Sequence, residues 1–339
     1  TLATYLDGLG VDGARDPLSR YMWWVPLAWG AVFTVVTSLI SRVIYGLQQS
    51  VRDALQLGNY RLEAKLGEGG MGEVYLAHHA LLKRPTAVKV LRPDRVGDGA
   101  VARFEREVQQ TARLTHPNVV AIYDYGRTAD NLFYYAMEYL DGLSLERLVE
   151  MDGKQPAGRA IHILSQVAHA LAEAHGCALI HRDVKPANIA LCDRGGVADM
   201  ATVLDFGLVK DLASPGPNLS SSDVVTGTPM YMAPELIAAP DRIDARVDIY
   251  ALGAVGYFLL TGRTVFEGST TVEICAHHLH RSPLAPSAHP GVDVPADIEA
   301  VILRCLAKDP AARYPSADTL RRALLSCQSA ADWGLEQAS

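Results

Sequence analysis

Two short stretches of the sequence carry side chains that together could move a phosphoryl group. HRDVKPAN, residues 181–188, contains Asp183, Lys185 and Asn188, and Asp205 follows in a DFG triplet. A carboxylate such as Asp183 can orient a hydroxyl or accept its proton, and a nearby lysine can neutralise a phosphoryl group. The Asn188 amide and the Asp205 carboxylate offer the oxygen ligands that Mg²⁺ prefers. This set predicts metal-assisted phosphoryl transfer.

A glycine-rich stretch earlier in the chain predicts a phosphate-binding loop. LGEGGMGEV, residues 66–74, contains G-x-G-x-x-G, which alone is a weak signal because dinucleotide-binding folds share it. In those folds the glycines open a helix, whereas here EVYL continues as a strand, so a hairpin tip is expected. Backbone N–H groups at such a tip can lie close to phosphates. The expected nucleotide contacts are Leu66, Gly67, Glu68, Gly69, Gly70, Met71, Gly72 and Val74.

Lys89 lies between apolar neighbours in AVKVL, on an expected strand. Most lysines lie at the surface, and a position at a strand edge would be the ordinary explanation. The functional alternative is a cation held against phosphates and steadied by a carboxylate. Glu107 in RFEREVQQ is the candidate partner, and Glu105 is the competitor that points about 200° away around the helix.

Taken in order, these motifs resemble the eukaryotic-type (Hanks-type) protein kinases, and specifically the bacterial Ser/Thr kinases. The resemblance covers about residues 59–327, which is most of the chain. It implies a bilobal α+β fold. A β-rich N-lobe would span 59–137, a hinge 138–141 and a helical C-lobe 142–327, before a C-terminal tail at 328–339.

The resemblance also implies roles for the residues that act on ATP and on the substrate. Asp183 matches the catalytic aspartate, and Lys89 matches the strand lysine that Glu107 would hold from a helix. Lys185 and Thr228 match the pattern of kinases that modify Ser and Thr residues of proteins. The cofactors would be ATP and Mg²⁺, with Mn²⁺ as a substitute. The metal ligands would be Asn188 and Asp205.

Three further features follow from the same resemblance. The adenine ring would lie among the gatekeeper, the hinge and two small residues. Glu235 would form a structural ion pair with Arg313, and Asp248 would brace the catalytic loop from a buried helix. The expected adenine contacts are Ala87, Met137, Glu138, Leu140 and Ala190.

The segment DLASPGPNLSSSD, residues 211–223, reads as a loop because Ser, Pro and Gly dominate it. By resemblance it belongs to the activation loop, and Arg182 would bind a phosphate on it. Ser220 and Ser222 match the positions that bacterial relatives phosphorylate, so autophosphorylation there is expected. The alternative is that a serine-rich loop is merely polar.

The stretch YMWWVPLAWGAVFTVVTSLI, residues 21–40, contains no charged side chain. A helix of this length reaches about 30 Å, the thickness of the hydrocarbon core of a bilayer. It lacks the polar face of an ordinary core helix and is longer than the apolar part of a signal peptide. We expect a transmembrane helix at 21–41, after a polar tail at 1–20 and before a juxtamembrane linker at 42–58.

This arrangement predicts a location, because a kinase needs cytosolic ATP. The chain would be anchored in a membrane, the inner membrane of a bacterium, with the kinase domain in the cytoplasm. An apolar stripe on the linker is compatible with a homodimer but does not specify one. One rival is a soluble kinase on which residues 21–40 pack. Another is a pseudokinase scaffold, whose mark would be loss of Lys89, Asp183 or Asp205; all three are present.

Composition narrows the class of protein further. The net charge of the 339 residues is −7, and no basic patch stands out, so no nucleic-acid partner is expected. The five cysteines form no C-x-x-C pair and are expected to be reduced. His277, His278 and His280 match no zinc spacing, and surface positions are expected for them.

Overall fold

The structure of the protein is a computed structural model. The chain divides into two compact units, Thr1–Leu57 and Gly58–Ser339. The described residues are 29–37, 56–69, 72–91, 105, 108–128, 132–206 and 229–334.

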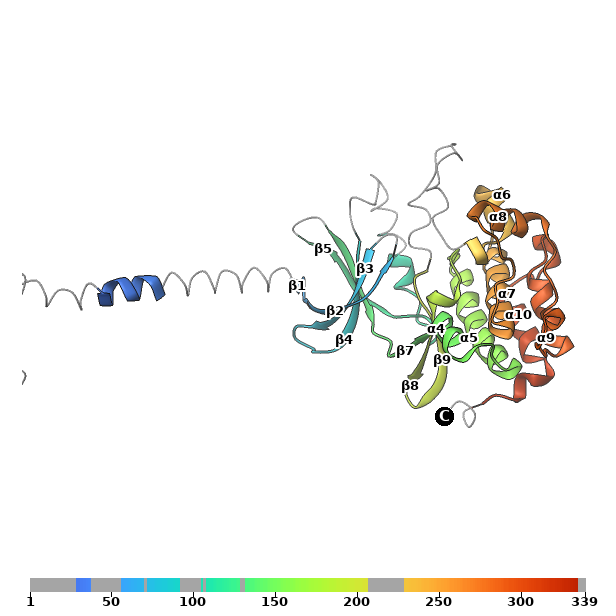
Figure 1. The fold of residues 1–339 in the computed structure, drawn as a ribbon, viewed down its shortest axis with the longest axis horizontal. Coiled ribbons are helices and arrows are strands. Elements are labelled where there is room, and N and C mark those ends of the chain that lie inside the picture. Colours follow the sequence, from blue (N-terminus) through green and yellow to red (C-terminus); the bar gives the residue numbers. More distant parts are fainter. Residues whose placement is uncertain are drawn as a thin grey trace, which may run out of the picture. The chain divides into compact units, whose positions relative to one another are not determined.

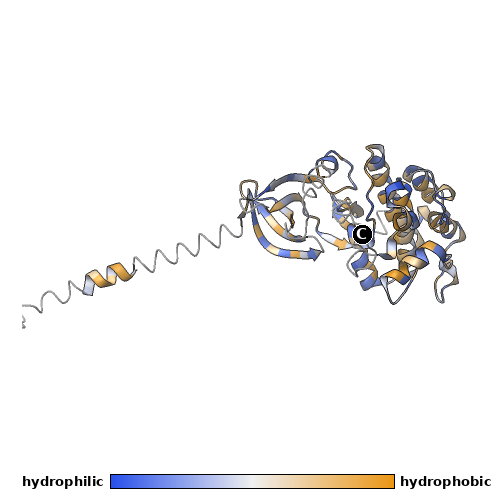
Figure 2. Cartoon of the chain, turned by 90° about the horizontal axis from the view of Figure 1, so that it is seen from above, coloured by the Kyte–Doolittle hydropathy of each residue, from blue (hydrophilic) through white to orange (hydrophobic). Residues whose placement is uncertain are grey.

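In the first unit, residues 29–37 form a helix and Gln56–Leu57 form the short strand β1. The helix is hydrophobic over most of its length (Figure 2), and its Trp29 and Phe33 side chains are exposed. Within the part of the chain that the structure describes, no helix has the length and apolar character needed to cross a membrane. The remainder of the span predicted at 21–41 lies outside the described residues.

The second unit begins with an antiparallel sheet whose strands run in the order β2-β3-β4-β6-β5 (Figure 1). Runs rich in Val, Tyr and Leu form these strands, as expected for residues that suit a pleated sheet. β6 lies between two neighbours and buries every residue from Phe133 to Met137. The strands are β2 (Tyr60–Gly69), β3 (Gly72–His79), β4 (Pro85–Leu91), β5 (Ile122–Arg127) and β6 (Phe133–Glu138).

A smaller sheet and a set of helices follow. The sheet has the order β7-β8-β9, with β7 at Gly142–Ser144, β8 at Ile189–Arg194 and β9 at Val197–Val203. The α-helices are α4 (Leu145–Asp152), α5 (Ala157–Gly176), α6 (Pro234–Ala238), α7 (Arg246–Thr261), α8 (Thr271–His280), α9 (Ala296–Cys305) and α10 (Ala317–Leu325). Short 3₁₀ turns are η2 (Pro186–Asn188), η4 (Pro229–Tyr231), η5 (Pro240–Arg242), η6 (Pro286–Ala288), η7 (Pro310–Ala312) and η8 (Gln328–Ala331).

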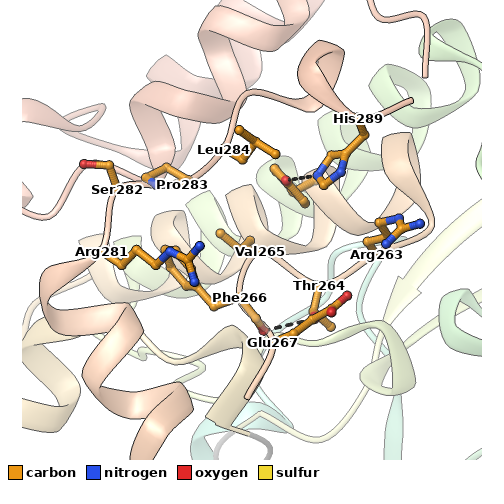
Figure 3. A pocket seen from close by; sticks show the side chains of 11 residues that line it. Arg263, Thr264, Val265, Phe266, Glu267, Arg281, Ser282, Pro283, Leu284 and His289 are labelled. Carbon is orange, nitrogen blue, oxygen red and sulfur yellow. Dashed lines mark hydrogen bonds between the residues drawn. The ribbon is translucent and has the colours of Figure 1, made fainter. Parts of the chain in front are cut away.

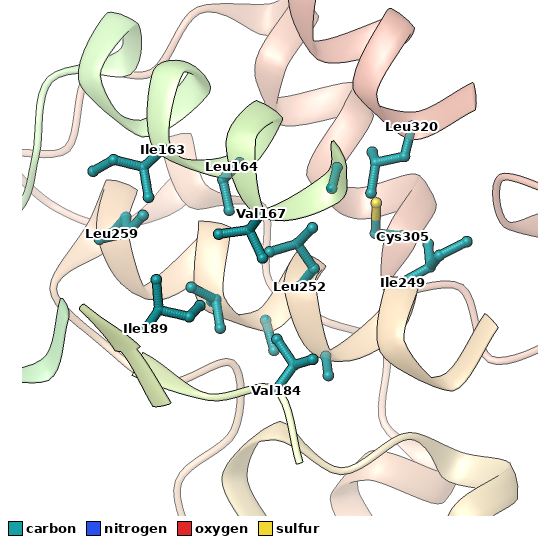
Figure 4. Close-up of a cluster of buried hydrophobic side chains, with 14 of the residues drawn as sticks. Ile163, Leu164, Val167, Val184, Ile189, Ile249, Leu252, Leu259, Cys305 and Leu320 are labelled. Carbon is teal, nitrogen blue, oxygen red and sulfur yellow. The ribbon is translucent and has the colours of Figure 1, made fainter. Parts of the chain in front are cut away.

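Helix α7 is the centre of the helical core. It is buried along nearly its whole length, which suits a helix that is apolar on all sides. Leu252 lies beside Val167 of α5, and Ile249 lies near Cys305 of α9 and Leu320 of α10 (Figure 4). Gly256 of α7 lets α5 and α9 pack closely against α7, because a side chain at this position would collide with Leu164 of α5 and Ile302 of α9. This rigid core supports the loop that carries Asp183.

The chain end packs against the helical core. The Trp333 indole Nε1 donates a hydrogen bond of 2.9 Å to Asp199 Oδ2, and the Arg159 guanidinium lies 5.1 Å from the centre of the indole ring. Asp199 also receives two hydrogen bonds from Arg159. Residues 328–334, expected as a C-terminal tail, therefore contact α5 and β9.

The expectation of surface histidines is wrong for His278. This side chain is fully buried, and its Nδ1 lies 2.8 Å from the hydroxyl of Tyr250. Burial lowers the pKa of His278 to about 4, so the ring is neutral at neutral pH. The apolar stripe of α8, which the sequence analysis did not consider, places His278 inward together with Ile274. Among the described residues, no group of three or more His, Cys, Asp or Glu side chains could hold a metal ion.

Glu235 and Arg313 form the expected ion pair. The two guanidinium nitrogens of Arg313 donate to the two carboxylate oxygens of Glu235 at 2.6 and 2.7 Å. The Arg313 side chain has no exposed surface and also donates to the carbonyls of Arg246, Ala307 and Lys308. One buried cation thus ties α6, α7 and the α9–α10 connection together.

Glu235→Gln should therefore destabilise the protein by about 3 kcal/mol or more, because it leaves the Arg313 charge buried without its counter-ion. Chemical denaturation measures this loss. Asp318→Asn is the matched control: its partner Arg322 has a side chain that is 69% exposed, so little change is expected. Equal losses in the two variants would contradict the structural role of the buried pair.

Candidate active site

The loop between α5 and η2 brings three predicted site residues together. Lys185 Nζ lies 2.8 Å from Asp183 Oδ2. The Asn188 amide Nδ2 donates to the same Oδ2 at 3.0 Å and to the Asp183 carbonyl at 2.9 Å. Because Nδ2 is the donor in both bonds, the amide presents its oxygen to the surroundings. The Asp183 carboxylate is thus held between a cation and an amide, with its side chain 22% exposed.

Asp248 fixes the backbone of this loop, as the family resemblance implied. Its carboxylate accepts hydrogen bonds from the backbone N–H groups of His181 and Arg182, both at 2.8 Å, and from His175 Nε2 at 2.8 Å. Burial alone would raise the pKa of the Asp248 carboxyl, but the bond from His175 and the nearby His181 lower it overall. Arg182 has a φ of 62°, a left-handed conformation that a non-glycine residue adopts only when its surroundings hold it.

Lys89 and Asp205 form a second cluster. Lys89 Nζ donates to Asp205 Oδ2 at 2.7 Å, and the Tyr135 hydroxyl donates to Asp205 Oδ1 at 2.6 Å. Burial would raise the pKa of the Asp205 carboxyl, but Lys89 and the Tyr135 hydroxyl hold it below its usual value. The carboxylate is therefore ionised and oriented by two donors.

The backbone connects the two clusters. The Leu204 N–H donates to the Asn188 carbonyl at 2.8 Å, which places Asp205 directly beside the end of the catalytic loop. Asp205 has a φ of 47°, again in the left-handed region. The following Phe206 is buried against the His181 ring, with ring centres 4.7 Å apart. His181 Nε2 also lies 2.9 Å from the Leu204 carbonyl, so one histidine supports both clusters.

The glycine-rich stretch forms the hairpin expected from the sequence. Gly69 pairs with Gly72, and Gly67 pairs with Val74, across β2 and β3. A side chain at Gly72 would collide with the Val90 carbonyl, whereas the space beside Gly67 is open. The exposed Glu68 carboxylate accepts a hydrogen bond from Lys65 at 2.7 Å.

The predicted adenine contacts lie on the two sheets and the hinge. Ala87 pairs with Met137 across β4 and β6, and both are buried. Ala190 is buried on β8. Side chains that pack on the same cluster as Ala87 and Met137 are Val74 and Leu140. Leu66 is 46% exposed at the start of the hairpin. These apolar side chains suit the flat faces of a purine.

The hinge residue Glu138 has a partner that the sequence analysis did not consider. Arg194, at the end of β8, donates to both carboxylate oxygens of Glu138 at 2.8 and 2.6 Å. Arg194 also donates to the Pro117 carbonyl at 2.6 Å. This arginine therefore joins the β8–β9 hairpin to the hinge and to the segment before β5.

Several predicted residues lie outside the described residues, and their roles stay predictions. The expected partner of Lys89, Glu107, is among them. Its competitor Glu105 is described and receives hydrogen bonds from Arg127 at 2.7 and 3.1 Å. The others are Gly70, Met71, Ser220, Ser222 and Thr228.

A separate cavity of about 340 Å³ lies between the end of α7 and the connection from α8 to η6 (Figure 3). Val265, Phe266 and Leu284 line it, together with Tyr257, whose hydroxyl lies 2.6 Å from His289 Nε2. None of the predicted site residues lines this cavity. We therefore assign it no part in phosphoryl transfer.

The residues around Asp183 and Asp205 are suited to a divalent cation beside a nucleotide. The two carboxylates and the Asn188 amide oxygen are hard ligands of the kind that Mg²⁺ prefers. Lys89 and Lys185 each face one carboxylate and supply positive charge for phosphate oxygens. Asp205 and Asn188 would hold the metal, and Asp183 would face a substrate hydroxyl. The arrangement can therefore position and stabilise a phosphoryl group in transfer.

Comparison with known proteins agrees with this geometry. The family model described as "Protein kinase domain" matches residues 60–325. Serine/threonine-protein kinase pkn3 of Myxococcus xanthus is 40% identical over 269 residues, which cover 78% of this chain and 49% of that protein. Serine/threonine-protein kinase PknB of Mycobacterium tuberculosis is 42% identical over 271 residues, which cover 78% of this chain and 42% of that protein.

A solved kinase-domain structure is also similar to this chain. The PknI kinase domain of Mycobacterium tuberculosis is 32% identical, with a TM-score of 0.60, and the match covers 79% of this chain and 96% of that one. The chain spans about half the length, or less, of the curated relatives named above. The match over most of this chain nevertheless includes both lobes and all of the described site residues. The chain belongs to the protein kinase domain family.

Proposed function

We propose that the chain is a serine/threonine protein kinase that transfers the γ-phosphoryl group of ATP to Ser or Thr hydroxyls of proteins. The observation that carries this proposal is the meeting of Lys89 and Asp205 beside Asp183, Lys185 and Asn188. These residues come from both lobes, and each has the chemical type that phosphoryl transfer uses. The names of the bacterial relatives support the same activity.

In this proposal Asp183 orients the substrate hydroxyl and accepts its proton. Lys185, 2.8 Å from Asp183, would contact the phosphoryl oxygens as the hydroxyl approaches. Lys89 would hold the phosphates from the opposite side of the cleft. Little bond-making falls to the protein, so its contribution is positioning and electrostatic stabilisation.

Asn188 and Asp205 are the proposed metal ligands. When bound, Mg²⁺ or Mn²⁺ would neutralise charge on the phosphate oxygens. Asp205 is ready for this role because Lys89 and Tyr135 hold its carboxylate in one orientation. Asn188 suits this role because its amide nitrogen donates to Asp183, so that its amide oxygen points away from Asp183 and would face the proposed metal.

Asp183→Asn should reduce phosphate transfer by about 10³-fold or more, equivalent to about 4 kcal/mol of transition-state stabilisation. The full chain is incubated with labelled ATP, Mg²⁺ and a generic protein acceptor, and incorporated label is counted. Asp193→Asn, an exposed position on β8, is the matched control and should keep full activity. Equal labelling by wild type and Asp183→Asn would contradict the kinase proposal, and a wild type without activity would favour the scaffold alternative.

We further propose that the chain autophosphorylates Ser220 and Ser222 in the activation loop. The support is the resemblance of this serine-rich segment to the phosphorylated loop of bacterial kinases, together with Arg182 beside Asp183. Phosphopeptide mapping of active wild-type protein should find phosphate at these serines, and Asp183→Asn protein made alone should carry none. Active enzyme with an unmodified loop would contradict this proposal.

We also propose that residues 21–41 anchor the chain in a membrane, with the kinase domain in the cytoplasm of a bacterium. The support is the charge-free sequence and the apolar, exposed side chains of the helix at 29–37. Pairing of two copies into a homodimer stays a prediction, since no described contact bears on it.

Val32→Arg with Val36→Arg should release the full chain from the membrane fraction, because each arginine near the centre of a span costs about 2.5–3.5 kcal/mol on insertion scales. Carbonate extraction of cells followed by sedimentation measures the distribution. Leu81→Arg, at a residue 86% exposed on the β3–β4 turn, is the control and should stay with the wild type. Wild-type protein found in the soluble fraction would contradict anchoring.

A further inference from the structure

Tyr135 is a buried tyrosine that touches the proposed metal ligand. Its hydroxyl donates to Asp205 Oδ1 at 2.6 Å, while Lys89 donates to Asp205 Oδ2 at 2.7 Å. Tyr135 is 1% exposed. It pairs with Lys89 in the register of β4 and β6, so the two donors come from directly opposed positions on adjacent strands.

We propose that Tyr135 is a positioning residue for metal binding: its hydroxyl holds the Asp205 carboxylate in the orientation that the cation requires. This inference rests on the proposed role of Asp205 as a metal ligand. Tyr135 itself contacts neither the cation nor the phosphates. It acts only through its hydrogen bond to Asp205 Oδ1.

The ring of Tyr135 is anchored well enough to fix a partner. Tyr135 alternates with Phe133 and Met137 on one face of β6, and all three belong to one apolar cluster with Ala87 and Leu91. A phenol in such surroundings needs a hydrogen-bond partner. The charged Asp205 carboxylate is an acceptor for this hydroxyl. The position of β6 therefore orients the Asp205 carboxylate through the Tyr135 hydroxyl.

The bond should matter for affinity as well as for geometry. Hydrogen bonds between a hydroxyl and a carboxylate at 2.5–2.7 Å are among the strong ones in proteins. Partners that orient a ligating side chain typically change metal affinity or activity by about 10–100-fold when removed. Lys89 can still neutralise Asp205 without Tyr135, but a single flexible donor leaves the carboxylate free to rotate. A conformation that rotates away from the metal weakens binding.

The test compares Tyr135→Phe with Tyr134→Phe in the full chain. Tyr134 precedes Tyr135 on β6 and is also buried. It faces the other side of the strand, where its hydroxyl lies near Gly58 and Gly126. Mn²⁺ is titrated into each protein in the presence of a non-hydrolysable ATP analogue, and electron paramagnetic resonance reports free and bound metal. Tyr135→Phe should bind Mn²⁺ about 10-fold more weakly than the wild type, and Tyr134→Phe should bind it normally.

Two further readouts separate positioning from general damage. Binding of the analogue without metal should be the same in Tyr135→Phe and wild type, and excess Mg²⁺ should restore the phosphorylation rate of the variant. Tyr135→Leu, which keeps the cluster apolar, gives a second variant without the hydroxyl if Tyr135→Phe unfolds. Equal Mn²⁺ affinity in wild type and the Tyr135 variants would overturn this inference alone. Absence of Mn²⁺ binding by the wild type would contradict the proposed metal site as well.

Discussion

The carboxylate of Asp248 is completely buried, yet it is ionised and accepts hydrogen bonds from His175 and from the backbone of His181 and Arg182. A buried charge is tolerated only when its partners are in place, so this interaction permits one path for the loop. The left-handed Arg182 is part of that path. Since α7 is packed on all sides, the position of Asp183 is set by the helical core.

The cleft then balances its charges in pairs. Asp183 is paired with Lys185, and Asp205 is paired with Lys89, so each carboxylate has a cation as its neighbour. The two pairs are joined by the backbone bond between Leu204 and Asn188, and His181 contacts both. Arg194 adds a link between the hinge and the small sheet. In the proposed reaction, Lys89 and Lys185 would contact phosphate oxygens while Asp205 holds the metal.

Much of this could be predicted from the sequence, because spacing within one strand or loop is local. The hairpin, the strand lysine and the catalytic loop follow from local motifs, whereas the pair of Glu235 with Arg313, 78 residues apart, followed only from the family resemblance. Tyr135 and Arg194 could not be predicted, since their partners lie 70 and 56 residues away. Alternation along FYYAME does place Tyr135 on the face of Met137, which was an available signal. The prediction of a surface position for His278 was wrong because it considered only the spacing of the histidines and not the apolar face of α8, on which His278 lies with Ile274.

In the proposed reaction, Asp205 holds a metal beside ATP. Calorimetric titration of ATP into the full chain, with and without Mg²⁺, tests it directly in wild type and in Asp205→Asn. Mg²⁺ should tighten ATP binding by about tenfold or more in the wild type, and this gain should be lost in Asp205→Asn. The same gain from Mg²⁺ in both proteins would contradict it.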